Sequence, residues 1–239
     1  MSTTPRIALV AGANGMVGSC LLQVLVEAPE YTRVYALTRR PLGRDHAKIA
    51  NRIVIFNRLA EQLKGLNAQD AYCCIGTTIK EAGSQDEFRD ADVEAVLRFA
   101  EAARALGATR FAVVSSVGAD INSKKFYLRC KGEMEEGVSR IGFPALDIFQ
   151  PSLLLGPRKQ ARPLETLGKI LAPALNPLLT GARESWRAIP AETVARGMLG
   201  AARRGGRGVY RHTYAAICQL AEIKPVLAVA SQSAKKGPA

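Results

Sequence analysis

The sequence predicts an α/β protein: a Rossmann-type, doubly wound parallel sheet with a small C-terminal substrate-binding segment. Short apolar strands alternate with amphipathic helices between residues 7 and 149, which is typical of a parallel sheet with helices on both faces. A glycine-rich turn joins the first strand to the first helix at residues 12–18. After residue 150 the alternation breaks down, so the remaining residues are expected to form a smaller and less regular part.

The first half of the sheet begins at residues 7–10, where Ile-Ala-Leu-Val is an uninterrupted apolar run. Such runs are typical of strands that are buried on both faces. The next element is a helix over residues 16–28, whose apolar residues recur at helical spacing and which stops before Pro29. Further strands are expected over residues 34–37, 52–56 and 71–75.

The second half begins at Ser84, which is followed three residues later by Glu87. This is the pattern of a capping box, in which hydroxyl and carboxylate satisfy free amides at the start of a helix. The helix carries its apolar residues on one face and ends near Gly107. The elements expected beyond it are a strand over 111–114, a helix over 123–140 and a strand over 145–149.

The C-terminal part has a weaker pattern. Residues 164–180 are apolar but interrupted by two prolines, which predicts short helices that form core or, less favoured, a lid. A helix is expected over residues 192–203, with Pro190 near its start, and a last one over 215–223. The tail over residues 224–239 is expected to be flexible.

Composition indicates a folded globular protein of 239 residues, with 48% hydrophobic and 23% charged residues. We find neither an apolar run of about 18 residues nor a signal peptide, so the sequence predicts a cytosolic protein without a membrane span. The five cysteines are odd in number and form no C-x-x-C pair, which favours reduced thiols over disulfides. The two histidines lie far from any cysteine cluster, and no metal site is expected.

The net charge of +12 includes a dense basic run over residues 203–207. Such a charge could attract nucleic acid or an anionic lipid surface. A charge run is more often a solvated face, and no pattern of interleaved aromatic residues accompanies this one. Specific nucleic-acid binding is therefore not expected, and a phosphate-bearing ligand would use part of the excess charge.

The glycine turn is the first motif that carries chemistry. Gly12 would allow the tight turn, Gly15 would let a pyrophosphate approach the backbone, and Gly18 would bring helix and strand together. The free amides at the helix start favour an anion. Since the motif lies between a predicted strand and a predicted helix, it predicts a dinucleotide site rather than a merely structural turn.

The second strand ends in Thr38-Arg39-Arg40. An NAD site usually places a carboxylate there against the ribose hydroxyls. Guanidinium groups instead bind a 2′-phosphate through charge-assisted hydrogen bonds. The pair therefore predicts NADP, with NAD less favoured, unless both arginines are only solvated loop residues.

A third motif lies on the helix after the fifth strand, where Tyr127 and Lys131 are four residues apart and share one face. A neighbouring ammonium stabilises a phenolate, so such a tyrosine can exchange a proton with a substrate. Ser116, at the end of that strand, lies where ligands bind in such sheets. The alternative is that Tyr127 packs on the core together with Met134 and Val138.

Together the three motifs resemble the short-chain dehydrogenase/reductase superfamily, and the G-x-x-G-x-x-G spacing resembles its extended and atypical branches. The segments 74–78, 115–120 and 126–133 are similar to the Tat-interacting protein 30 family of oxidoreductase-like proteins. This resemblance implies NADP binding, with Ser116, Tyr127 and Lys131 as the catalytic set. The residues that it implies around the cofactor are Gly12, Asn14, Gly15, Met16, Val17, Arg39, Arg40, Cys74, Ile75, Gly76, Ser115, Tyr127, Lys131, Pro151, Ser152 and Leu153.

The resulting functional hypothesis is an NADP-dependent oxidoreductase that acts on a small carbonyl or alcohol substrate. An NADP-binding regulator with little turnover is one alternative, and a nucleotide-sugar epimerase-like isomerase is another, although the part after residue 151 is short for such a substrate. We expect a single NAD(P)-binding Rossmann domain over residues 1–223, in which residues 151–223 form the substrate-binding part. A homodimer is possible.

Overall fold

The computed structural model describes residues 5–43, 45–156 and 179–222. A seven-stranded parallel sheet forms its centre, in the order β3-β2-β1-β4-β5-β6-β9. The Rossmann-type sheet predicted from the sequence is therefore confirmed. Its strands are β1 (Arg6–Ala11), β2 (Tyr31–Thr38), β3 (Ile49–Ile53), β4 (Asp70–Cys73), β5 (Arg110–Val114), β6 (Ala145–Phe149) and β9 (Gly208–His212).

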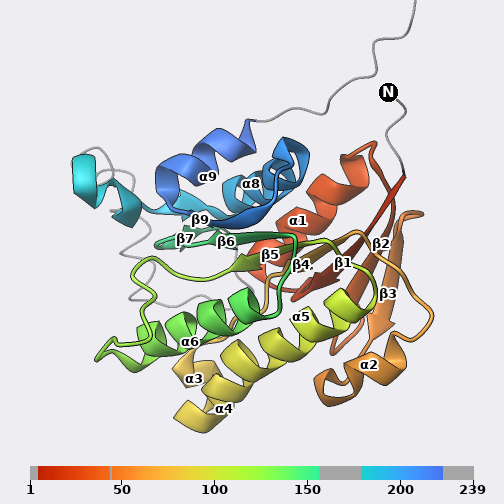
Figure 1. Cartoon of the computed structure of the whole chain (residues 1–239), viewed down its shortest axis with the longest axis horizontal. Coiled ribbons are helices and arrows are strands. Elements are labelled where there is room, and N and C mark those ends of the chain that lie inside the picture. The colour runs from red at the N-terminus through yellow and green to blue at the C-terminus, as the bar shows by residue number, and fades with distance from the viewer. Residues whose placement is uncertain (1–4, 44, 157–178, 223–239) are drawn as a thin grey trace, which may run out of the picture.

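Helices cover both faces of the sheet (Figure 1). One face is covered by α1 (Met16–Glu27), α8 (Ala191–Arg204) and α9 (Tyr214–Ala221). The other is covered by α2 (Leu59–Gln62), α5 (Ala95–Ala105) and α6 (Phe126–Arg140). The shorter elements are η1 (Phe56–Arg58), α3 (Ile79–Ala82), α4 (Gln85–Arg89), η2 (Asp90–Glu94), η4 (Gly181–Trp186) and the strand pair β7 (Leu154–Leu155) and β8 (Ile189–Pro190).

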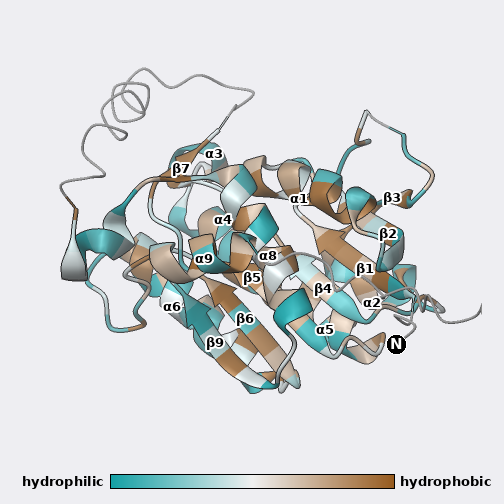
Figure 2. Ribbon diagram, turned by 90° about the horizontal axis from the view of Figure 1, so that it is seen from above, coloured by the Kyte–Doolittle hydropathy of each residue, from teal (hydrophilic) through white to brown (hydrophobic). Residues whose placement is uncertain are grey.

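Each face of the sheet packs on its helices through a separate apolar core. Leu9 and Phe111 belong to the core below α5 and α6, whereas Val10 and Phe149 belong to the core below α1 and α8. In Figure 2, hydrophobic colour runs along β1, and hydrophilic colour marks parts of the helices. Burial of alternate residues on opposite faces explains why the central strands are apolar without interruption.

The strand expected over residues 52–56 is wrong in its bounds. Its counterpart β3 spans Ile49–Ile53 and, in the part of the chain that the structure describes, pairs only with β2, at the edge of the sheet. An edge strand has one open side, so it does not need a continuous apolar run: Ile53 is 60% exposed. The apolar residues that suggested a strand instead lead into the short helical turn η1.

Helix α6 begins three residues later than expected. Ser123 accepts the N–H of Lys125 with its side chain and donates its own N–H to Asp120, so it belongs to a turn before the helix. The expected start at Ser84 is confirmed, since the Ser84 hydroxyl accepts the N–H of Glu87. The long helix also ends as expected, just before Gly107, whose φ is +88°.

Two C-terminal features differ from the expectations. Strand β9 was not predicted: it pairs with β6 although its residues Gly-Val-Tyr-Arg-His are mostly exposed. The basic run is also less solvated than expected, because Arg203 pairs with Glu30 at 2.6 Å and Arg204 with Asp147 at 2.9 Å. Most of the segment 164–180 and the tail 224–239 lie outside the described residues.

No helix in the described part of the chain combines the length and the apolar composition that a membrane-spanning helix requires.

Candidate functional site

The strand order creates a crevice at the carboxyl ends of β1 and β4. Strand β1 pairs with β2 on one side and with β4 on the other. The chain first builds β2 and β3 on one side of β1 and then crosses over to continue with β4 on the other side. Ligands of such sheets bind at this switch point. A cavity of about 780 Å³ opens here, called the β1–β4 cavity below, and its volume lies within the range of small-molecule sites.

The glycine turn forms one wall of this cavity. Gly12 has a φ of +77°, and a Cβ atom on it would lie 2.4 Å from the carbonyl of Cys74. A Cβ on Gly18 would lie 2.2 Å from the Gly12 oxygen. Gly15 is different, because its nearest backbone neighbour would be 3.1 Å from an added Cβ and the residue lines the cavity. Gly12 and Gly18 thus close the turn, and Gly15 is the glycine that faces the open space.

Helix α1 starts directly after Gly15, which is its N-cap. Gly15 has no side chain to cap the helix, so the amides of the first turn remain open toward an anion. The helix dipole adds a partial positive charge at the same point. This arrangement fits the pyrophosphate site that the sequence predicts.

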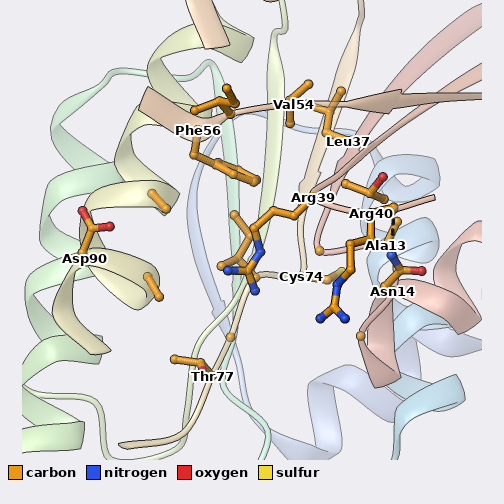
Figure 3. A pocket seen from close by; sticks show the side chains of 18 of the residues that line it. Ala13, Asn14, Leu37, Arg39, Arg40, Val54, Phe56, Cys74, Thr77 and Asp90 are labelled. Carbon is orange, nitrogen blue, oxygen red and sulfur yellow. Dashed lines mark hydrogen bonds between the residues drawn. The ribbon is translucent and has the colours of Figure 1, made fainter. Parts of the chain in front are cut away.

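Arg39 and Arg40 follow β2 and both extend into the β1–β4 cavity (Figure 3). The side-chain amide of Asn14 donates to the carbonyl of Arg40 at 3.4 Å and links the glycine turn to the end of β2. Among the described residues neither guanidinium forms an ion pair. Two exposed cations beside the glycine turn are therefore available to an anionic ligand.

The remaining walls of the cavity are of two kinds. Leu37, Val54 and Phe56 form an apolar side near the arginines (Figure 3). The carboxylates lie on the opposite side, where Asp90 pairs with Arg98 at 3.0 Å. Positive charge therefore concentrates at the end of β2.

The predicted catalytic pair lies on α6. Lys131 is buried, and its Nζ lies 6.0 Å from the ring centroid of Tyr127. Tyr127 itself is 37% exposed, and its ring contacts that of Phe88 at 5.8 Å. The ring of Tyr127 thus packs on the core residue Phe88 and is partly open to solvent, whereas Met134 and Val138 are buried.

Lys131 is held by an acidic residue that the sequence analysis did not single out. Its Nζ lies 2.7 Å from Oδ2 of Asp92, which is buried in η2. The other carboxylate oxygen accepts the backbone N–H of Thr77 at 2.7 Å. Burial alone would lower the pKa of Lys131, but the Asp92 carboxylate, with a smaller contribution from Tyr127, raises that pKa above the ordinary lysine value.

The two serines after β5 have different environments. The Ser115 hydroxyl is buried and donates to Glu135 at 2.6 Å, and Glu135 also accepts from Gln150 and Arg211. Among the described residues, the Ser116 hydroxyl contacts only the neighbouring carbonyl of Val117, at 3.3 Å, and Ser116 is partly exposed. Ser116 is therefore the serine whose hydroxyl can turn toward a substrate.

The segment after β6 lies beside the Ser116 loop. The N–H of Val117 donates to the carbonyl of Pro151 at 3.0 Å, and the Ser152 hydroxyl donates to the carbonyl of Trp186 at 2.9 Å. Leu153 accepts the N–H of Ile189 at 2.9 Å. The structure thus brings the predicted segment 151–153 next to the strand ends.

The β1–β4 cavity unites only part of the predicted site. The predicted residues that line it are Gly12, Asn14, Gly15, Arg39, Arg40, Cys74, Ile75 and Gly76. Those outside its lining are Met16, Val17, Ser115, Ser116, Tyr127, Lys131, Pro151, Ser152 and Leu153. Thr77 connects the two sets, because it lines the cavity and binds the carboxylate that holds Lys131.

Cys73 lies close to this connection but is not a nucleophile at neutral pH. Burial raises the pKa of the Cys73 thiol to about 12. In the described residues no group of three or more His, Cys, Asp or Glu side chains could hold a metal ion.

A signal for Asp92 was present in the sequence. Asp92, Val96, Phe99 and Ala103 recur at helical spacing, and all four are buried on one side of the helical run from η2 into α5. An acidic residue within an apolar stripe is rarely buried without a partner. The pattern therefore indicates a paired carboxylate, although it does not name the partner.

Two relatives align with most of the chain. The rat protein HTATIP2 is 34% identical over 80% of this chain and 78% of its own length. The protein fmp52 of Emericella nidulans, named as mitochondrial, is 34% identical over 76% of this chain and 80% of its own length. The resemblance inferred from the motifs is thereby confirmed.

Solved structures with the same fold include MoeE5 in complex with UDP-glucose and NAD, at a TM-score of 0.64 and 20% identity, covering 86% of this chain and 75% of that one. The ADP-L-glycero-D-manno-heptose-6-epimerase of Helicobacter pylori matches with a TM-score of 0.66 and 19% identity, covering 89% and 78%. At these identities the likeness shows the fold alone.

The profile of the NAD dependent epimerase/dehydratase family matches residues 8–121, which include the glycine turn, the two arginines and Asp92. Together with the relatives, this match shows that the chain belongs to the NAD-dependent epimerase/dehydratase family, an NAD(P)-binding family of the atypical short-chain dehydrogenases/reductases.

Proposed function

We propose that this protein is an NADP-dependent oxidoreductase that acts on a small carbonyl or alcohol substrate. The observation that carries the proposal is the pair on α6, in which an exposed tyrosine lies beside a buried and charged lysine. A phenol in this setting can exchange a proton with a substrate oxygen, because the ammonium stabilises the phenolate. The pair is joined through Asp92 and Thr77 to a cavity that fits a dinucleotide.

The cavity residues fit NADP at two places. The pyrophosphate would lie against Gly15 and the open amides of α1. A 2′-phosphate would lie between the guanidinium groups of Arg39 and Arg40, and the adenine ring against Val54 and Phe56. Among the described residues that line the cavity, no carboxylate follows β2 directly, where an NAD site would use one.

A nicotinamide dinucleotide held by the β1–β4 cavity would provide the hydride acceptor or donor of the proposed reaction. Tyr127 gives a proton to the substrate oxygen during reduction and takes one from it during oxidation. Ser116 donates a hydrogen bond to the same oxygen. Lys131 stays protonated and stabilises the phenolate form of Tyr127, and its ammonium would hold the ribose of the cofactor.

An epimerase-like isomerase is the second candidate, because the matching family includes epimerases and a heptose epimerase from Helicobacter pylori shares the fold. MoeE5 and the Helicobacter pylori epimerase are longer than this protein, which covers 75% and 78% of their chains. An isomerase would keep its cofactor tightly bound and show no net change in nicotinamide absorbance. A chain that binds NADPH without either reaction would instead act as a cofactor-dependent regulator.

The dinucleotide preference is testable by titration. We expect NADPH to bind roughly 10- to 100-fold more tightly than NADH, since each hydrogen bond to a charged group contributes about 1.5–3 kcal/mol. Replacing Arg39 and Arg40 by Ala should narrow this ratio by weakening NADPH alone. Fluorescence titration with both cofactors measures the ratio directly.

The matched control is Arg33→Ala. Arg33 is an exposed arginine on β2, the strand that precedes Arg39 and Arg40, and it lies outside the cavity lining. The Arg33→Ala variant should leave both affinities unchanged. Equal affinities of the parent for NADPH and NADH would refute the proposed preference for NADP.

Three further expectations stay predictions. They are a small-molecule substrate without a specific nucleic-acid partner, a homodimer and a cytosolic location. For the last of these, the name of the fmp52 relative places that relative in mitochondria.

A further inference from the structure

Asp92 joins two parts of the site that are separate in the sequence. Its side chain is fully buried, and its two oxygens contact different elements. Oδ1 accepts the N–H of Thr77, in the loop that lines the β1–β4 cavity after β4. Oδ2 lies 2.7 Å from the ammonium of Lys131 on α6.

We propose that Asp92 is a positioning residue, which fixes Lys131 in its charged form beside Tyr127 and ties that ammonium to the cavity loop at Thr77. This inference rests on the dinucleotide-dependent function proposed above. Among the described residues, the Asp92 carboxylate contacts Lys131 and the Thr77 N–H and makes no hydrogen bond to Tyr127. It therefore acts on Tyr127 through Lys131. Neither the motif nor the resemblance assigned it this part.

The environment of Lys131 shows why a carboxylate is needed there. The titratable groups that face its ammonium are Asp92 from η2, Tyr127 from α6 and Cys73 from β4. The Cys73 thiol is neutral, since burial raises its pKa to about 12. Without Asp92 the ammonium would remain buried without a compensating charge, and a lysine in that situation loses its proton more readily.

The local backbone supports a specific placement rather than an incidental contact. Asp92 lies in η2, a wide helical turn of π type between α4 and α5. Such turns occur often at functional sites, since they change the direction in which side chains point. Phe88, one turn earlier, contacts the ring of Tyr127 at 5.8 Å. The same helical segment therefore contacts both members of the catalytic pair.

The decisive variant is Asp92→Asn. It keeps the size of the side chain and an oxygen for the Thr77 N–H, but it removes the negative charge beside Lys131. The side-chain resonance of Lys131 can be followed by NMR in the full chain with isotope-labelled lysine, between about pH 7 and 11. A Lys131→Met variant identifies that resonance.

In the parent we expect Lys131 to stay protonated above the ordinary lysine range. In Asp92→Asn the measured pKa should fall by about 1 or more, because burial is no longer opposed. Affinity for NADPH should then decrease as the pH rises through the new value, by roughly tenfold, whereas the parent shows a flatter profile. A purely structural role would lower stability without this change in pH profile.

Asp70→Asn is the matched control, because Asp70 is also a buried, ion-paired aspartate but lies at the opposite end of β4 and binds Arg6 and Tyr31. It should leave the Lys131 resonance and the pH profile unchanged.

An unaltered Lys131 titration in Asp92→Asn overturns the proposal. A shifted Lys131 titration together with an unaltered pH profile of NADPH affinity overturns it too. A parent that binds neither dinucleotide refutes the proposed function instead, and the lysine titration still decides whether Asp92 sets the charge. If Asp92→Asn does not fold, Asp92→Glu replaces it, because this variant keeps the charge but moves the carboxylate. An Asp92→Glu protein with an unchanged Lys131 titration and an unchanged NADPH profile would contradict the proposed positioning role of Asp92.

Discussion

Tyr127→Phe is expected to lower turnover by about 10²–10⁴-fold, the contribution that a positioned proton donor or acceptor typically makes. The substitution removes the phenolic hydroxyl but keeps the ring, so the contact with Phe88 is retained. Affinity for NADPH should change little, since the buried ion pair of Lys131 with Asp92 does not involve the hydroxyl. Nicotinamide absorbance with a panel of small carbonyls and alcohols measures turnover, and fluorescence titration measures affinity.

Tyr210→Phe is the control for loss of a tyrosine hydroxyl. Tyr210 lies on β9, and its hydroxyl donates to the carbonyl of Arg207 at 2.7 Å, outside the site. Its turnover should equal that of the parent. Lys131→Ala should impair both turnover and NADPH affinity, because the Lys131 ammonium is proposed to stabilise the Tyr127 phenolate and to hold the ribose of the cofactor.

The possible results separate the candidate functions. Near-parental turnover in Tyr127→Phe would show that the proposed proton transfer is wrong. Binding of NADPH by parent and variant, without turnover of any carbonyl or alcohol, would favour the regulator. Retention of a dinucleotide with interconversion of sugar-nucleotide epimers would favour the isomerase.

The sequence predicted the centre of the fold well because local signals and tertiary requirements agree there. Strand β1, the glycine turn and α1 follow one another within 22 residues, from Arg6 to Glu27, and the same apolar pattern that predicts them also forms the core. The edge strands were less predictable. Strands β3 and β9 each pair with only one neighbour, so their sequences carry exposed and charged residues.

Prediction of the site was likewise limited to features that are local in the sequence. Glycine spacing and the tyrosine–lysine spacing are local, and the structure confirms the turn geometry at Gly12 and the shared helix face on α6. The Asp92–Lys131 pair joins residues 39 positions apart in the chain through the packing of η2 on α6. Sequence spacing can show that Asp92 is on a buried stripe, but only the packing of the two helices identifies its partner.

Substitutions at Gly15 and Gly18 should have large but different effects. Gly18 is needed for the structure of the turn, whereas Gly15 is expected to be needed for cofactor binding. Gly18→Ala places a Cβ 2.2 Å from the oxygen of Gly12, so backbone must move. Such overpacking typically costs about 1–3 kcal/mol, and this variant should lose stability even without a ligand. Thermal unfolding of the unliganded protein measures that loss.

Gly15→Val should have the opposite profile: nearly parental folding and a loss of NADPH affinity of about 100-fold or more. Gly15 has φ −75° and ψ 173°, which other residues adopt without strain. An added Cβ would lie 3.1 Å from the Gly12 oxygen, a tight contact that requires a backbone shift of a few tenths of an ångström, far less than the overlap at Gly18. The valine would instead occupy the space that the pyrophosphate needs in front of the α1 amides, and the loss of two hydrogen bonds to a charged group, each about 1.5–3 kcal/mol, accounts for the magnitude. Circular dichroism establishes the fold, and titration with NADPH gives the affinity. Parental affinity in a folded Gly15→Val protein would place the phosphates elsewhere.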